Sequence, residues 1–243
     1  MQDFVVFLPK PDSTTEATHQ TDSVMVRDWQ AQYPNHAEFS FYSGCILMVD
    51  LALQCFDHVR RVRSESAYQG FWDVHYTLIK EMKVRRSALR KHLDPASVRR
   101  DPLAFSLHMN LCATEICFHD AAISQIKGQG LPDELSSESR KSSTAAALRI
   151  AAAVKMTWPT SDGQADLLAL QATFTAWPLV MAIGVLSRDL GLSPRDLNVS
   201  ESSANSLHLL FAALDRVEHV EGYWHGETRV AKDILGSLGN EAL

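Results

Sequence analysis

The stretch "LHMNLCATEICFHDAAI", residues Leu107 to Ile123, decides the fold class. It contains no glycine or proline, and its apolar residues fall on almost every side of a helix. A helix that is apolar all round has to be buried by other elements on all sides. Its polar exceptions are spaced by four, three and four residues and therefore share one helical face. They are His108, Cys112, Glu115 and His119.

Helical patterns recur before and after this stretch. Asp101 and Pro102 suit the N-cap and the first turn of the helix that contains it. Trp177-Pro178 is expected to kink a later helix. The predicted helices cover about residues 24–33, 41–63, 71–92, 101–126, 139–157, 164–190, 201–220 and 227–238. We therefore expect an all-α fold, a seven- to eight-helix orthogonal bundle, with residues 1–23 as a flexible or irregular segment and 24–243 as a single helical domain.

The composition is that of an ordinary globular protein, with 46% hydrophobic and 21% charged residues. No apolar run reaches the roughly 20 residues that span a bilayer. The first residues include an acid where a signal peptide carries positive charge, and a proline before any long apolar stretch. We therefore expect an intracellular protein, cytoplasmic or nuclear. The four cysteines match no zinc-binding spacing and are interpreted as reduced core residues: Cys45, Cys55, Cys112 and Cys117.

The charge is unevenly distributed along the chain. Residues 58–100 carry eleven Lys or Arg against four Asp or Glu, whereas residues 161–243 carry five against eleven. A basic band of this kind could meet phosphates or an acidic partner. A solvated helical face is the simpler interpretation, because no aromatic residues interleave the basic run "KVRRSALRK".

Several common enzyme motifs are missing from the sequence. It has no GxGxxG, no GxxxxGK[ST], no HExxH and no GxSxG. A terpene synthase would need a carboxylate cluster for magnesium, and the nearest pair, Asp162 and Asp166, stands alone. We therefore expect no cofactor.

Four segments, in this order along the chain, resemble a known protein family: "GFWDVHYTLIKEMKVRRSAL", "AFSLHMNLCATEICFHDAAI", "GLPDELSSESRKSSTAAALRIAAAV" and "FTAWPLVMAI". Together, over roughly Gly44 to Gly191, they resemble the regulatory (middle homology) domain of fungal transcription factors of the zinc binuclear cluster class. The resemblance implies a helical module that senses metabolites or relays signals. That family binds DNA through six closely spaced cysteines near the N-terminus. Here Cys45 is the first cysteine, so we expect no zinc cluster and no direct DNA binding.

The polar face of the 101–126 helix offers two interpretations. Glu115 and His119, four residues apart, could pair, which would raise the histidine pKa and orient the ring for acid–base work on a ligand. They could equally be a buried network between helices. His108 and His119 lie about 16 Å apart along the axis, too far for one metal ion, so no metal site is predicted.

Aromatic and sulfur-bearing residues could line an apolar pocket or simply belong to the core. With Cys112, the candidates for substrate binding are Phe71, Trp72, Tyr76, Trp158, Phe174, Trp177 and Met181. His75 fits a packed core histidine better than a base. The segment "EGYWHGE" could be a lid or a plain loop.

Two functional hypotheses follow. The first is a regulatory domain repurposed as a cofactor-independent cyclase or isomerase of the pericyclic, Diels–Alder type in natural-product biosynthesis, acting on a hydrophobic small molecule. His119, with Glu115 behind it, or His108 would polarise the substrate. The chain's own initial Met and the missing DNA-binding part favour it slightly. The alternative is a non-DNA-binding regulator or ligand sensor that acts through a protein partner. A homodimer is compatible with both.

Overall fold

The computed structural model describes residues 7–8, 24–25, 41–64, 70–158, 166, 171–192 and 197–221. Over these residues the fold is all-α, which confirms the predicted class. The helices are α2 (Phe41–Ser64), α3 (Phe71–Ala88), α4 (Pro95–Arg100), α5 (Pro102–Gly128), the 3₁₀ helix η1 (Asp133–Ser136), α6 (Ser137–Thr157), α8 (Ala172–Leu192) and α9 (Leu197–Glu221). Two short strands, β1 (Phe7–Leu8) and β2 (Val24–Met25), pair antiparallel near the N-terminus.

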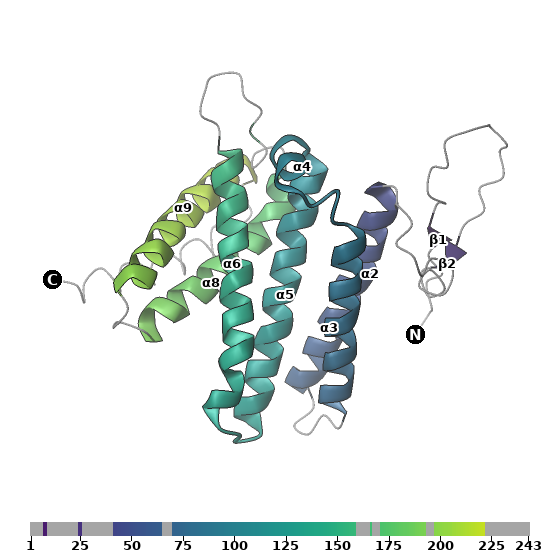
Figure 1. Ribbon diagram of the computed structural model, residues 1–243. Helices are drawn as coiled ribbons and strands as arrows, with labels where there is room; N and C mark the ends of the chain where they lie inside the picture. Colours follow the sequence, from purple (N-terminus) through teal and green to yellow (C-terminus); the bar gives the residue numbers. More distant parts are fainter. Residues whose placement is uncertain are drawn as a thin grey trace.

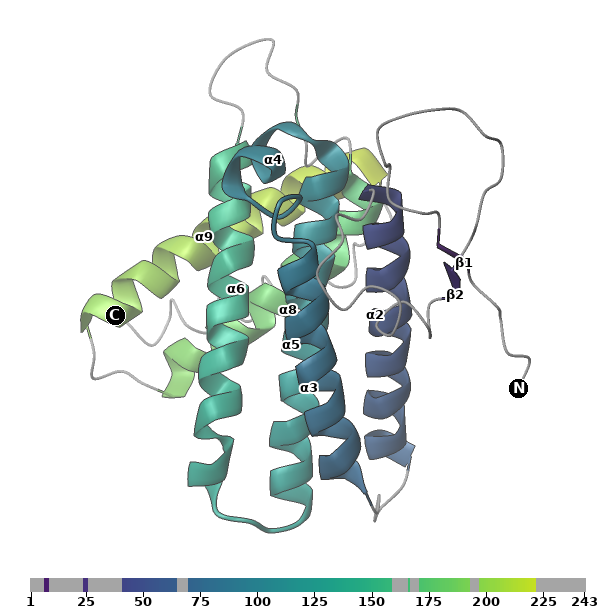
Figure 2. The same cartoon turned by 45° about the vertical axis from the view of Figure 1, so that its right-hand side comes forward.

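The long helices form a layered bundle. Helices α2, α3, α5 and α6 run side by side, while α8 and α9 are inclined to them, with α8 crossing α6 and α5 (Figure 1, Figure 2). Helix α5 packs against α2, α4, α6 and α8. None of the helices among the described residues is long and apolar enough to cross a membrane.

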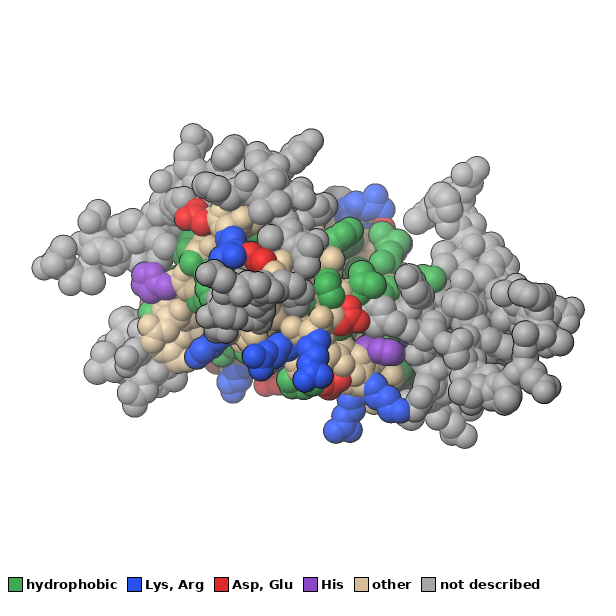
Figure 3. All heavy atoms as spheres, turned by 90° about the horizontal axis from the view of Figure 1, so that it is seen from above, with side chains coloured by type: hydrophobic (Ala, Val, Ile, Leu, Met, Phe, Trp, Pro, Cys, Tyr) green, Lys and Arg blue, Asp and Glu red, His purple; other side chains and the backbone are tan. Residues whose placement is uncertain are grey.

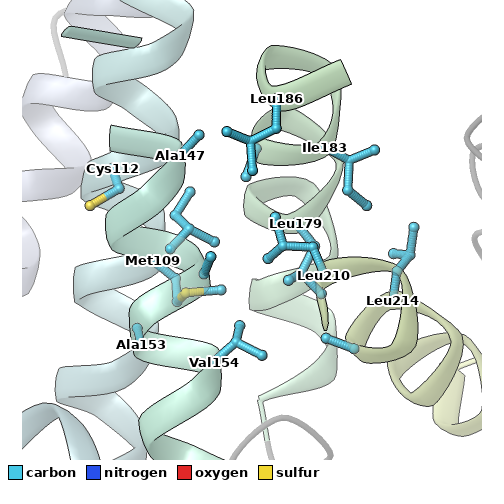
Figure 4. Close-up of a cluster of buried hydrophobic side chains, with 14 of the residues drawn as sticks. Met109, Cys112, Ala147, Ala153, Val154, Leu179, Ile183, Leu186, Leu210 and Leu214 are labelled. Atoms are coloured by element: carbon cyan, nitrogen blue, oxygen red, sulfur yellow. The ribbon is translucent and has the colours of Figure 1, made fainter. Parts of the chain in front are cut away.

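Helix α5 lies between two hydrophobic cores, which is why its sequence is apolar on nearly every side. The larger core lies between α5, α6, α8 and α9, and Figure 4 shows part of it. Alanines such as Ala147 and Ala153 are fully buried on α6, and larger side chains such as Leu179 and Leu210 face them. The smaller core, with Leu51, Leu111 and others, lies between α2, α3 and α5.

Because Gly44 has no side chain, α2 can approach the turn that follows α3. A Cβ atom at this position would lie 2.3 Å from Cδ2 of Leu89, which is itself fully buried. A larger residue here would require the end of the Leu89 side chain to shift.

The predicted helix boundaries hold for most elements, but the first predicted helix is wrong, and α8 begins at Ala172, later than the predicted residue 164. We expected a helix over residues 24–33, but Val24 and Met25 belong to β2, and the rest of that range lies outside the described residues. The sequence did not predict α4, in which Asp94 is the N-cap and accepts hydrogen bonds from the amides of Ala96 and Ser97. A helix of six residues is too short to show a helical period. The helix predicted at 227–238 lies outside the described residues.

The N-cap of α5 gives a direct test of the fold. The Asp101 side chain accepts a hydrogen bond from the amide of Leu103, with Pro102 at the first helical position, as the sequence predicts. Asp101→Ala leaves that amide without its partner and should lower the free energy of unfolding by about 1 kcal/mol. Urea denaturation measures the loss. Asp101→Asn, which keeps the acceptor, should stay within a few tenths of wild type; equal losses in both variants would contradict the assignment.

Candidate functional site

The polar face of α5 meets two neighbouring helices. The carboxylate of Glu115 accepts hydrogen bonds from Arg86 of α3 at 3.0 Å and from Arg149 of α6 at 2.5 Å. Its side chain is only 16% exposed. Both hydrogen bonds accepted by this carboxylate therefore join α5 to other helices, and neither comes from His119.

His119 lies in a buried group of rings. It is close to His75 of α3, whose ring stacks on Phe118 with centroids 3.9 Å apart and planes 1° apart. His75 Nδ1 is 3.4 Å from Nε2 of His58 on α2. Phe71 stacks on both His58 and His75. Three helices thus contribute to one aromatic and histidine cluster.

Burial sets the protonation of these histidines. Desolvation lowers the pKa of His58 to about 4, and for His75 desolvation, together with the nearby His58 and His119, lowers the pKa to about 3. The sequence predicted that Glu115 would raise the pKa of His119. The Glu115 carboxylate does act in that direction, but desolvation outweighs it and the pKa of His119 falls. Its Nδ1 is buried without a hydrogen-bond partner among the described residues.

His108 and Cys112 occupy the other end of the same face. The Sγ of Cys112 lies 3.8 Å from Nε2 of His108. Desolvation, followed by the charges of Arg86 and Arg149, lowers the pKa of His108 to about 4. Burial raises the pKa of the Cys112 thiol. At neutral pH this end is therefore an uncharged imidazole beside an uncharged thiol. No group of three or more His, Cys, Asp or Glu positioned to hold a metal ion occurs in the part of the chain that the structure describes.

Arg85 is a buried polar residue that the sequence interpretation missed, as it missed His58, Arg86 and Arg149. It belongs to the basic run expected to be a solvated face, yet its side chain is 3% exposed. It donates to the carbonyl of Leu47 at 2.5 Å, to Asp50 at 2.8 Å and to Glu81 at 2.8 Å. The Glu81–Arg85 spacing was the available signal, but the sequence could not show that α2 would cover this position.

The predicted pocket residues are distributed over four places. Phe71, Trp72 and Tyr76 belong to the histidine cluster, although Tyr76 is mostly exposed. Met181 packs against the larger core, which includes Cys112. Trp158 also packs against the larger core and borders a surface hollow with Arg99, Arg100 and Lys155. Phe174 and Trp177 line a groove between α2, α5 and α8. The structure therefore does not gather these residues around one cavity.

The groove beside Phe174 and Trp177 is open and apolar. It encloses about 640 Å³. Its lining is Cys45, Met48, Val49, Ala52, Leu53, Phe56, Leu103, Ser106, Leu107, Asn110, Leu111, Thr114, Gln171, Phe174 and Trp177. Phe56 and Trp177 meet edge to face with centroids 5.3 Å apart. In the view from the α4 end, exposed hydrophobic side chains gather in a patch, with several Lys and Arg side chains along the opposite edge (Figure 3).

The ion pairs of Glu115 should contribute more to stability than a surface pair does. Glu115→Gln removes the charge that two partly buried guanidinium groups share, so we expect the free energy of unfolding to fall by about 2 kcal/mol. The matched control is Asp120→Asn, which breaks the more exposed pair with Arg188 and should cost less than about 1 kcal/mol. If both variants lose the same unfolding free energy in urea denaturation, the ion pairs of Glu115 stabilise the fold no more than a surface pair does.

The buried histidines should make stability depend on pH. Their pKa values are lower in the folded chain than in the unfolded one, so the unfolded state binds more protons as the pH falls below about 6.5. The contribution of the neutral histidines to the unfolding free energy is complete above that pH. It is lost as the pH falls toward their pKa values in the folded chain, about 4 for His58 and about 3 for His75.

Substituting one histidine isolates its contribution to this loss. His75→Phe keeps a ring on Phe118 but removes the titration. It should flatten the pH dependence of the unfolding free energy by up to about 1.4 kcal/mol per pH unit between pH 6 and 4. An unchanged slope in urea denaturation at each pH would show that His75 is not held neutral by the fold.

Comparisons with known proteins connect the chain to fungal gene regulators. It is 43% identical over 189 residues to the depudecin biosynthesis cluster-specific transcription activator of Alternaria brassicicola, covering 77% of this chain and 28% of that protein. It is 43% identical over 191 residues to the activator of the same name from Fusarium langsethiae, covering 77% of this chain and 30% of that protein.

The chain thus spans less than a third of the length of the curated relatives it matches. No family model matches the chain, and no solved structure matches it. The chain is therefore related, over about three quarters of its length, to a segment of fungal cluster-specific transcription activators.

Proposed function

We propose that this chain is a regulatory module of natural-product gene expression, a ligand sensor that acts through a protein partner and does not itself bind DNA. The observation that carries the proposal is the 43% identity to activators whose names link them to one biosynthesis cluster. We expect the module to work in the nucleus. It corresponds to the regulatory domain of zinc binuclear cluster factors that the helix motifs resemble.

The placement of the polar residues supports a sensor over an enzyme. A pericyclic catalyst has to enclose its substrate and present a polarising donor to it. Here Glu115 is bound by two arginines, and His108 and His119 lie among packed helices. The apolar groove opens on another side of α5, where its lining includes none of these three residues. The cyclase predicted from the sequence stays a prediction.

Fusion of the full chain to a bacterial DNA-binding protein tests the regulatory function. In yeast carrying the matching operator before a reporter gene, we expect the fusion to change transcription several-fold relative to the DNA-binding protein alone. The change requires a partner that the module recruits or excludes. Immunoblots have to show equal amounts of both proteins. An unchanged reporter at equal expression, in cells where a complete related activator works, would refute the proposal.

The cyclase prediction is tested separately with purified protein. Unsaturated intermediates encoded by its gene neighbourhood would be incubated with wild type and with His119→Ala, and products would be followed by mass spectrometry and chromatography. A cyclase would form product, and His119→Ala would reduce turnover far more than it lowers the unfolding free energy. The regulatory proposal expects no turnover in either sample.

A further inference from the structure

The groove between α2, α5 and α8 concentrates exposed hydrophobic surface. Of the large hydrophobic side chains exposed among the described residues, half line this groove. They are Val49, Leu53, Phe56, Leu103 and Phe174. Leu53 is 63% exposed and Phe174 is 60% exposed. Such a concentration marks a binding surface, because isolated exposed hydrophobic residues would be scattered.

The lining is uncharged and has few polar groups. No Asp, Glu, Lys or Arg is among the described residues that border the groove. Asn110 and Thr114 already use donors within the protein: Asn110 Nδ2 bonds the carbonyls of Ser106 and Phe174, and Thr114 Oγ1 bonds the carbonyl of Asn110. The groove therefore favours a neutral occupant that is apolar over most of its surface.

Gln171 supplies an unused acceptor. It lines the groove at the start of α8, and its side-chain Oε1 is buried with no hydrogen-bond partner among the described residues. Its backbone carbonyl is already bonded, by the amide of Phe174 at 2.9 Å and the hydroxyl of Thr175 at 3.0 Å. A buried oxygen without a partner is unfavourable, and a turn of the side-chain amide that points Oε1 into the groove would let a ligand donor remove that cost.

We propose that this groove binds a neutral, mainly apolar small molecule that carries one hydroxyl or N–H group, with Gln171 Oε1 as its acceptor. The volume of about 640 Å³ lies within the roughly 300–1,000 Å³ of small-molecule sites. The proposal deepens the sensor function and rests on it for its biological role. Binding itself is a property of the purified chain and is measured without transcription.

N-phenyl-1-naphthylamine is a suitable probe, because it is neutral and apolar, carries one N–H donor and fluoresces in apolar surroundings. Titrated with the full chain, it should show saturable binding of one probe per chain. Leu53→Glu, which places a charge on the groove wall, should weaken binding at least tenfold. Leu135→Glu is the matched control, because Leu135 is 58% exposed and lies outside the groove lining; it should change binding less than twofold.

A second variant tests the acceptor. Gln171→Leu should weaken N-phenyl-1-naphthylamine several-fold while leaving 1-phenylnaphthalene, which has no donor, unchanged. Circular dichroism and urea midpoints have to show that all variants are folded. An equal loss for both probes would refute the acceptor role.

Non-saturable binding of N-phenyl-1-naphthylamine, or equal effects of the two leucine variants, would overturn the site. So would a wild-type dimer that Leu53→Glu dissociates, because the groove would then hold a second copy of the chain. None of these results depends on the reporter, which can succeed or fail independently.

Discussion

The carboxylate of Glu115, shared by Arg86 and Arg149, connects the central helix to the helices on either side of it. Helix α5 is covered on both sides by hydrophobic cores, so a charged side chain between them needs a partner, and Glu115 finds two in neighbouring helices. A charge in this position is tolerated only because opposite charges reach it from α3 and α6. The ion pairs thereby join both helices to α5, the helix that lies between the two cores.

The same exclusion of water determines the state of the other polar groups inside the bundle. His58 and His75 are held neutral and stack with phenylalanine rings, so they act as aromatic core residues. Arg85 cannot lose its charge and therefore needs Asp50, Glu81 and a backbone carbonyl around it. In both cases desolvation decides the outcome: the weak bases lose their proton, and the strong base is surrounded by acceptors.

Because these polar groups have structural roles, we propose recognition on the outside of the bundle. The groove between α2, α5 and α8 combines exposed apolar side chains with one unused acceptor, at a site where no described residue is charged. An open hollow of this kind suits reversible binding of a ligand, whereas a reaction that depends on excluding water needs a closed one. The relation to fungal transcription activators supports the proposed regulatory role.

The sequence by itself determined the helical class, the central buried helix and its N-cap, because hydrophobic periodicity and capping are local properties. It also placed Glu115 and His119 on one face. Only the tertiary structure decided what that face meets. Arg86 and Arg149 lie 29 and 34 residues from Glu115 along the chain, and no local pattern pairs them. The aromatic residues considered as one pocket are divided among separate places for the same reason. Helical spacing shows which side of its own helix a side chain lies on, but it does not show which neighbouring helix covers that side.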